Sequence, residues 1–342
     1  MKNLELVPNG HTFTIDEEKP FLITAQDFQN ISRIGVLVYT LLRSVVEGMK
    51  KSSLTISDLL CFGLDTGYRN LGTIHPERLP TLIRVDLMVD VCGRWKIAEI
   101  DPANKHGTGF ALATRYESGA GERQKLLSLL APYITDDVTI VLGRKETFFR
   151  FEQRYLAEKL AEHTGKNVVV VPEEKLAKKL GGGLILDFPF CDNASTELLT
   201  RRFMEQPECF INPPRHFLGG KALMTMPYEH AEWLEDAGMS KPEIDELKKY
   251  LPPTYLGPFV GKEVFSSGAK GVSFHGVDNR AVFQQYVTQN SFSLGGTEKF
   301  IRMACFFVGS SLGELIVSAN TVLPVHGGNT AVHYHVNMKK EG

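Results

Sequence analysis

The sequence predicts a protein of mixed fold class, part α/β and part α+β, and three observations along its 342 residues support this. An amphipathic helix and a hairpin of strands come first, at 25–51 and 82–100. Strands then alternate with helices between about 135 and 212, the pattern of a parallel sheet with crossover helices. After a helical stretch, strands separated by short turns fill 257–338, which indicates an antiparallel sheet.

The first two elements are predicted by spacing and turn chemistry. Between 25 and 51 the apolar residues recur three and four positions apart, which places them on one helix face. They are Phe28, Ile31, Ile34, Leu37, Val38, Leu41, Leu42 and Val45. The apolar run 82–89 is typical of a strand, 90–93 of a turn, and 95–100 of the returning strand. The sequence therefore predicts a helix followed by a hairpin.

The remaining elements follow from the same patterns. In the α/β segment we expect strands at 138–142, 167–171, 184–188 and 209–211, and helices at 147–163, 173–180 and 195–205. From 213 to 255 the pattern is helical, with interruptions at Gly219-Gly220 and Pro252-Pro253. The last strands are expected at 259–265, 281–288, 300–308, 314–323 and 331–338.

Composition and charge bound the class of protein. Lys and Arg number 38 against 40 Asp and Glu, and hydrophobic residues make up 43%, as in ordinary globular proteins. The net charge of −2 argues against nucleic acid as a main partner. No apolar run is long enough for a membrane span, no signal peptide is visible, and no C-x-x-C pair occurs among the five cysteines. We therefore expect a cytoplasmic protein without a membrane partner or a disulfide framework.

Four of the charged residues on the predicted hairpin form two pairs with the same spacing. Arg84 and Asp86 are two apart on one strand, and Glu99 and Asp101 are two apart at the end of the other. Side chains two apart share a face, so we expect the three acids to meet and to repel unless a cation lies between them. Carboxylate oxygens suit Mg²⁺. The alternative is an exposed hairpin end with solvated acids.

A lysine and a loop of small residues follow in the C-terminal half. Lys262 lies on a predicted strand that leads into this loop, whose backbone N–H groups can close over phosphates. The loop residues of interest are Ser266, Ser267, Gly268, Lys270 and Gly271. The alternative is a flexible hairpin with solvated lysines. The G-x-x-x-x-G-K-[ST] motif of a P-loop does not occur.

The strand predicted at 281–288 combines amide and apolar side chains. Its central residues are Gln284, Gln285, Tyr286 and Val287. Backbone groups of such a strand suit the edge of an adenine base, while an ordinary sheet strand would carry the same pattern.

Two further groups of polar residues lie near the C-terminus. Arg302 enters an otherwise apolar strand and needs an anion, either a phosphate or carboxylate ligand or a structural ion-pair partner. His326, His333 and His335 gather around a glycine-rich turn. They are candidates for zinc or, with no fourth ligand in view, for ordinary polar lining.

The order of these motifs resembles that of the circularly permuted ATP-grasp enzymes, of which eukaryotic glutathione synthetase is the best-known type. In that family an Arg-x-Asp strand and a Glu-x-Asn strand precede an inserted α/β domain, and the lysines and the glycine-loop lid follow it. Here Arg84 and Glu99 begin the two acidic motifs, and Asn212, Lys221 and Lys262 follow the α/β segment. The resemblance spans about 80–323.

Three positions depart from the family pattern. Asp101 stands where Asn is usual, which keeps an oxygen ligand but adds a charge. Gln284 or Gln285 stands where Glu is frequent, and the loop has only two glycines, Gly268 and Gly271.

The resemblance implies an ATP-grasp fold in four parts. These are N-terminal helices with the acidic hairpin (1–134), a parallel α/β substrate subdomain (135–212), a helical and β-hairpin lid (213–280) and the rest of the core sheet (281–342). It also implies roles: Asp86, Glu99 and Asp101 hold Mg²⁺, or Mn²⁺ in its place. Lys221, Lys262, the small-residue loop and 284–287 bind ATP.

The remaining implied roles are catalytic and substrate-binding. Arg302 would neutralise the transferring phosphoryl group, and Arg84 would orient the substrate or the acids. Asn104, His326 and Asn329 are expected near the substrate.

The function implied is that of an ATP-dependent ligase. Such an enzyme activates a small-molecule carboxylate as an acylphosphate and joins it to an amine, releasing ADP and phosphate, mostly by positioning and charge neutralisation. Two alternatives stay open: a small-molecule kinase on the same fold, and a nucleotide-binding regulator without turnover. A homodimer also stays open.

Overall fold

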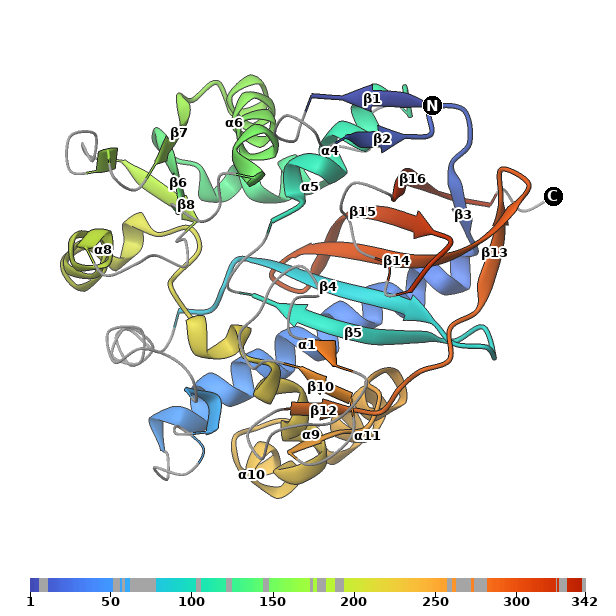
Figure 1. Cartoon of the computed structure of the whole chain (residues 1–342). Helices are drawn as coiled ribbons and strands as arrows, with labels where there is room; N and C mark the ends of the chain where they lie inside the picture. The colour runs from blue at the N-terminus through green and yellow to red at the C-terminus, as the bar shows by residue number, and fades with distance from the viewer. Residues whose placement is uncertain are drawn as a thin grey trace.

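The fold is built on one large sheet, shown in the computed structural model of Figure 1. The structure describes residues 1–5, 12–51, 56, 59–61, 78–102, 106–120, 125–143, 148–172, 175–176, 183–187, 194–256, 260–262, 272–273, 282–323, 325 and 331–339. Within these ranges a nine-stranded, a four-stranded and a three-stranded sheet are combined with helices. The protein is therefore mixed α+β, as predicted.

The nine-stranded sheet joins the two ends of the chain to the acidic hairpin. Its order is β1-β2-β16-β15-β14-β4-β5, with β13 on β14 and β3 on β16. The strands are β1 (Lys2–Leu4), β2 (Phe13–Ile15), β3 (Phe21–Ile23), β4 (Leu82–Val89), β5 (Trp95–Asp101), β13 (Ser291–Leu294), β14 (Thr297–Val308), β15 (Ser311–Asn320) and β16 (Val332–Met338). Pairing is antiparallel except where β16 meets β2 and β3. The hairpin and the three C-terminal strands were predicted, whereas β1 to β3 were not.

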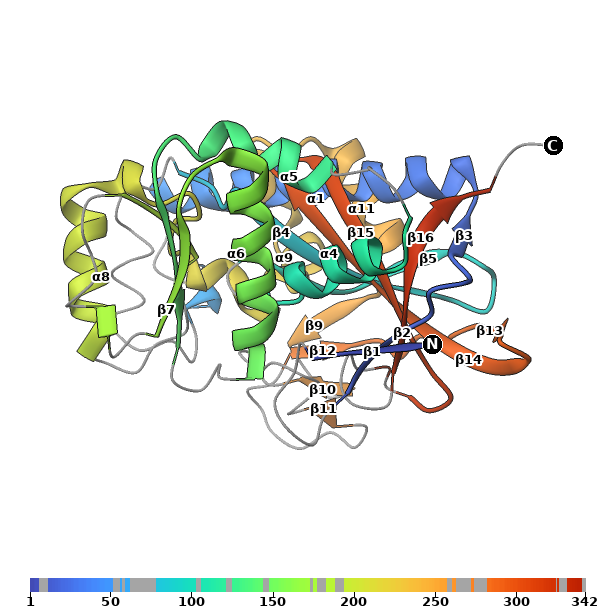
Figure 2. The same ribbon diagram turned by 90° about the horizontal axis from the view of Figure 1, so that it is seen from above.

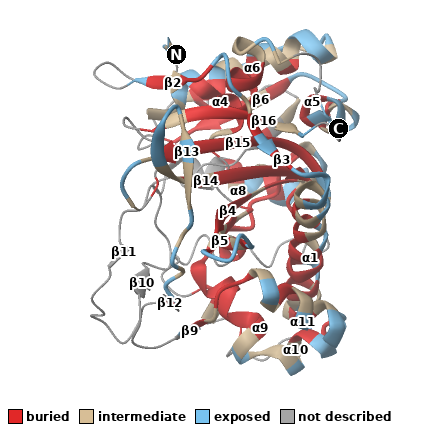
Figure 3. Cartoon of the chain, turned by 90° about the vertical axis from the view of Figure 1, so that its right-hand side faces the viewer, coloured by how far each residue is buried: buried red, intermediate tan, exposed pale blue. Residues whose placement is uncertain are grey.

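Helix α1 (Ala25–Lys50) covers one face of this sheet, at the place that the apolar spacing predicts. Thr24 and Asp27 form a capping box at its start, and the Trp95 indole N–H also donates to Asp27. The buried residues of α1 pack against alternate residues of the strands, among them Val85 and Met303. Burial in Figure 3 follows this pattern, along the inner side of α1 and the central strands.

The opposite face of the sheet is covered by α4 (Thr108–Glu117) and α5 (Lys125–Leu130), two helices that we did not predict. Phe110 and Leu126 belong to a second core with Ala304 and Phe306, which alternate with the residues facing α1. Figure 2 shows α1 and α4 on opposite sides of the central strands. The two cores thus occupy the two faces of one sheet.

The segment 135–212 contains the predicted parallel sheet, in the order β7-β6-β8. Its elements are β6 (Val138–Leu142), β7 (Val168–Pro172), β8 (Leu184–Asp187), α6 (Arg150–Thr164) and α8 (Ala194–Glu205). The strand expected at 209–211 is wrong: Pro207, with its fixed backbone angle, begins the 3₁₀ turn η4 (Pro207–Cys209). The helix expected at 173–180 lies outside the described residues except for 175–176.

The segment that follows is helical, as predicted, and then enters a four-stranded sheet. The helical elements are η5 (His216–Gly219), η6 (Lys221–Thr225), α9 (Met226–Glu229), α10 (Ala231–Asp236) and α11 (Lys241–Tyr250). The sheet order is β11-β10-β12-β9, with β9 (Thr254–Leu256), β10 (Val260–Lys262), β11 (Val272–Ser273) and β12 (Val282–Gln284). The strand predicted at 281–288 is shorter: β12 ends at Gln284, opposite Thr254, because the residues that would continue β9 there are Pro252 and Pro253, which have no N–H to donate. Among the residues described here, no helix is long and apolar enough to cross a membrane.

Candidate active site

A β-bulge turns the acids of the hairpin away from α1. Asp86 pairs with Glu99 and Leu87 pairs with Ile97, so β5 has one extra residue, Ala98, at this point. Leu87 and Ile97 lie in the core beneath α1. Strict alternation would place Glu99 on the same side as Ile97. The extra residue in the bulge shifts the alternation by one position and brings the Glu99 side chain to the face that carries Asp86.

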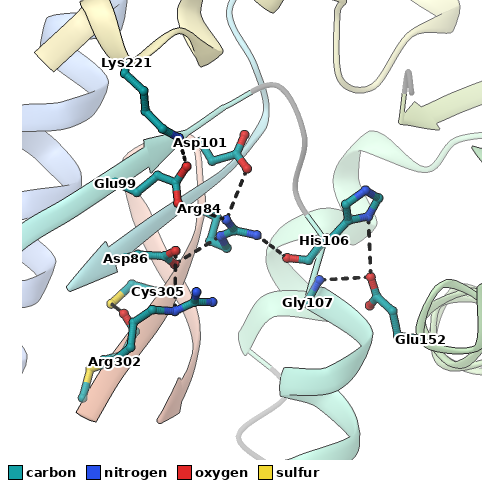
Figure 4. A network of polar contacts seen from close by, with 11 residues as sticks. Arg84, Asp86, Glu99, Asp101, His106, Gly107, Glu152, Lys221, Arg302 and Cys305 are labelled. Carbon is teal, nitrogen blue, oxygen red and sulfur yellow. Dashed lines mark hydrogen bonds and ion pairs between the residues drawn. The ribbon is translucent and has the colours of Figure 1, made fainter. Parts of the chain in front are cut away.

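Arg84 lies at the centre of the polar network in Figure 4. Its Nε is 3.1 Å from Asp86 Oδ1, and its Nη2 is 3.3 Å from Asp101 Oδ2 and 3.9 Å from Glu99 Oε2. Its Nη1 donates to the backbone carbonyl of His106 at 2.7 Å. One guanidinium therefore contacts all three acids that were expected to bind the metal.

Two more cations complete the network from distant parts of the chain. Lys221, at the start of η6, pairs with Glu99, and Arg302, on β14, places its Nε 3.6 Å from Asp86 Oδ2. The side chains of Lys221 and Asp86 are 8% and 2% exposed. The structure thus brings together six of the predicted site residues, three acids and three cations whose formal charges cancel.

The acids are neither solvated nor crowded against one another. The exposed-hairpin alternative is wrong, since Asp86 is buried and Glu99 and Asp101 are largely covered. In this structure the cation between the acids is the Arg84 guanidinium, while the expected Mg²⁺ stays a prediction. Burial by itself lowers the pKa of Arg84, but the nearby carboxylates raise it well above its ordinary value.

The residues as arranged do not fit a metal centre. Within the described ranges, no group of three or more His, Cys, Asp or Glu side chains could hold a metal ion. The Asp86 carboxylate can nevertheless accept further hydrogen bonds. Neither of its buried oxygens accepts one from the residues described, although both lie near guanidinium groups. A buried carboxylate of this kind is a candidate to gain a partner when a ligand binds.

The network continues to Glu152, which sequence reasoning missed. Glu152 lies on α6, is 0% exposed, and accepts hydrogen bonds from the N–H groups of Gly107 and Gly109. Burial raises its pKa, against these bonds and the nearby His106. One signal was available: Glu152 is four residues before Leu156 and so shares the apolar face of the predicted helix.

The sheet that carries Lys262 is linked to the acidic hairpin. Lys262 lies on β10, beside Val282 of β12, and the structure describes its backbone. Gln284, at the end of β12, is buried, and its Nε2 donates to the carbonyl of Ile97 on β5 at 3.4 Å. Its neighbour Gln285 is exposed. Gln284 therefore connects this sheet to the acidic hairpin.

The other expected binding residues contribute less or are not described. Tyr286 is exposed and Val287 is half-buried. The expected site residues outside the described ranges are Ser266, Ser267, Gly268, Lys270, Gly271, Asn104, His326 and Asn329.

Two of the C-terminal histidines are buried on β16. His333 stacks on Phe13 with a centroid distance of 4.1 Å, and its Nδ1 is 3.1 Å from Ser318 Oγ. Burial and the charge of Arg302 lower the pKa of His333 to about 3, so the imidazole is neutral in the folded protein. His335 is also buried, and burial lowers its pKa. These contacts fit the polar-lining alternative.

Comparison with known proteins finds similarity in three dimensions only. No family model matches the chain, and no curated protein matches it in sequence. A solved structure, that of a glutathione synthetase-like effector from Globodera pallida in apo form, is similar with a TM-score of 0.57. The identity is 10%, and the match covers 98% of this chain and 93% of that one. At this identity the likeness shows that the two chains share a fold.

Proposed function

We propose that the chain is an ATP-dependent ligase with a circularly permuted ATP-grasp fold, which joins a small-molecule carboxylate to an amine. The observation that carries this proposal is the gathering of Arg84, Lys221 and Arg302 on one face of the sheet, together with three acids. The fold shared with a glutathione synthetase-like protein supports it, as does the order of the motifs along the chain.

The chemistry proposed needs positioned positive charge. A carboxylate oxygen of the substrate attacks the γ-phosphorus of ATP, the bond to the β,γ-bridging oxygen breaks, and ADP leaves. The amine nitrogen then attacks the carbonyl carbon, loses a proton and displaces phosphate. Lys221 and Lys262 would hold ATP phosphates, and Arg302 would neutralise the transferring group. In this proposal Arg84 orients the acids and the substrate.

A metal ion would accompany the nucleotide. We propose Mg²⁺, or Mn²⁺, as the ion that accompanies ATP. Asp86, Glu99 and Asp101 offer oxygen ligands, but in this structure they are engaged by Arg84, Arg302 and Lys221. The chemistry above is therefore assigned to the cations of the chain.

A nucleotide-binding protein without turnover is the second candidate, and one observation favours it. The three acids are already neutralised by cations of the chain, which is a stable arrangement without ligand. Such a protein would bind ATP through Lys221 and Lys262 and leave it intact.

Hydroxylamine separates these functions, because it traps an acylphosphate as a hydroxamate whatever the natural amine is. The chain is incubated with Mg·ATP, hydroxylamine and pools of amino acids or short dicarboxylates, and ADP and hydroxamate are measured. We expect both products in equal amounts with one pool. Lys221→Met should lower the rate about 30- to 1,000-fold, because the lost contact strengthens in the transition state. Lys249→Met, at an exposed lysine of α11, is the matched control.

Each outcome selects one function. ADP without hydroxamate, released only with added alcohols, would indicate the kinase. Binding of Mg·ATP without ADP release in any pool would indicate the non-catalytic protein and overturn the ligase.

A further inference from the structure

Glu152 holds the start of a helix that belongs to another part of the molecule. It lies in the first turn of α6, beside the parallel three-stranded sheet, and its carboxylate contacts the N-terminus of α4. Oε1 accepts from the Gly107 N–H at 3.0 Å and Oε2 from the Gly109 N–H at 2.7 Å. Gln153 Nε2 donates to Oε1 at 2.9 Å. The carboxylate thus has partners on both oxygens.

Helix α4 has no side-chain cap of its own. Gly107 occupies the N-cap position with a φ of 102°, a conformation that suits glycine, and has no side chain to bond the orphan N–H groups. Glu152 supplies the acceptor from outside, and its negative charge complements the helix dipole. The approach is close: a Cβ at Gly109 would lie 1.9 Å from the carbonyl oxygen of Glu152.

The other end of the same turn holds Arg84. The carbonyl of His106 accepts from Arg84 Nη1 at 2.7 Å, and the His106 ring stacks on Phe149, just before α6, at 3.7 Å. Two residues of one segment therefore contact the turn 106–109: Phe149 by stacking and Glu152 by hydrogen bonds. The carbonyl of His106 reaches Arg84, as Figure 4 shows.

We propose that Glu152 is a positioning residue, which fixes the turn 106–109 so that the His106 carbonyl holds Arg84 among the acids. It does so from the α/β segment and thereby couples that segment to the candidate site. The effect on Arg84 depends on the geometry alone, while the effect on ATP rests on the proposed function.

The test compares two buried glutamates. Glu152→Gln keeps the size of the side chain but places an N–H₂ group against a backbone N–H, so the turn loosens. Glu314→Gln is the matched control, because Glu314 is also buried and is hydrogen-bonded to Arg115, and its side chain contacts none of the network residues in the part of the chain that the structure describes. Glu152→Asp keeps the charge with one methylene fewer and serves if Glu152→Gln does not fold.

Two readouts are measured on each variant. The first is the hydrogen exchange of the Arg84 Nε–H group by NMR, assigned with Arg84→Lys. The second is the Kd for Mg·ATP by calorimetry. We expect Glu152→Gln to speed the exchange about 10-fold and to weaken Mg·ATP binding about 10-fold, with a smaller effect for Glu152→Asp. Glu314→Gln should lower the thermal midpoint but leave both readouts within about twofold of the parent chain.

The exchange rate decides the proposal. If the Arg84 Nε–H group of Glu152→Gln exchanges within twofold of the parent rate, Glu152 does not position Arg84 and the proposal fails. Where Glu152→Gln does not fold, the same criterion is applied to Glu152→Asp. If Glu314→Gln speeds the exchange equally, the effect is general destabilisation and the proposal fails too. If the parent chain binds no Mg·ATP but Glu152→Gln still speeds the exchange, positioning stands and the proposed function is overturned.

Discussion

At the scale of single residues, the polar network depends on the shape of Arg84. A guanidinium presents five N–H donors in one plane, so it contacts several acceptors at once, whereas an ammonium acts as a point charge. Arg84 uses this to reach Asp86, Asp101, Glu99 and the carbonyl of His106. Lys221, with a single ammonium, pairs with Glu99. The residue types could be predicted from sequence, but their partners could not.

Changing Glu99 to Gln tests the pairing with Lys221. Because Lys221 is buried, the loss of its carboxylate leaves an ammonium without a counter-charge, and we expect the free energy of unfolding to fall by about 1–3 kcal/mol. Thermal unfolding with Glu298→Gln, at an exposed acid of β14, as control measures this. Acids that only repelled one another would give unchanged or higher stability.

The buried His333 predicts a pH dependence with a definite sign. Its pKa is lowered to about 3 in the folded protein, from an ordinary value of 6.5. Below about pH 6.5 the unfolded chain binds a proton that the folded chain excludes, so stability falls as the pH decreases towards 3. The slope is at most about 1.4 kcal/mol per pH unit.

The measurement compares unfolding midpoints of the parent chain and His333→Gln between pH 4 and 7. Gln keeps a polar group for Ser318 but does not titrate. The difference between the two proteins should shrink or reverse as the pH falls. A constant difference across this range would contradict the assignment of His333 as a neutral buried side chain.

At the scale of elements, backbone detail determines which groups meet. The bulge at Ala98 sends Glu99 to the site face and keeps Ile97 in the core, so one strand serves both. Helix α1 approaches the sheet closely at Gly35, where a Cβ would lie 2.1 Å from the ring of Phe307. Gly35 therefore allows the close contact between α1 and the sheet, and it does not mark a turn.

Gly35→Ala tests that contact. Alanine favours a helix by about 1 kcal/mol over glycine, yet the buried Phe307 ring has no room for the added methyl group, so we expect a net loss of about 1–3 kcal/mol. Urea unfolding measures it. Leucine is smaller than phenylalanine and leaves room for the added methyl group. Gly35→Ala should therefore lower the free energy of unfolding less in the Phe307→Leu background than in the parent chain. Raised stability in Gly35→Ala would show that α1 lies further from β14.

At the scale of the whole molecule, the sheet closes the chain on itself. β16, the last strand, pairs in parallel with β2 and β3 from the first 23 residues. Phe13 and Ile15 of β2 are 1% and 0% exposed and belong to the same core as Phe110 of α4. The N-terminal segment is therefore part of the core sheet and covers His333.

Removal of residues 1–16 tests this closure. It deletes two large side chains from the core and uncovers an edge of β16, so we expect a loss of more than about 4 kcal/mol and poor solubility. Removal of residues 1–5 alone, which deletes only the partly exposed edge strand β1, is the control and should change little. Equal thermal midpoints for the two truncations would contradict a structural role for β2.

What the sequence determined by itself was local. The helix at 25–50, the hairpin at 82–101, the alternation between 138 and 187 and the last three strands were predictable because their periodicity lies within each segment. The charged residue types at 84, 86, 99, 101, 221 and 302 also pointed to one site.

Only the tertiary structure decided how these parts meet. Lys221 and Glu99 are 122 positions apart, and Glu152 is 45 positions from Gly107. The short strands β1 to β3 carry too few residues for a periodic signal; β2 and β3 form on the edge that β16 offers, and β1 pairs with β2. Such pairings depend on packing between distant segments, and on a one-residue bulge that no local pattern marks, so the partners of the charged groups follow from the fold.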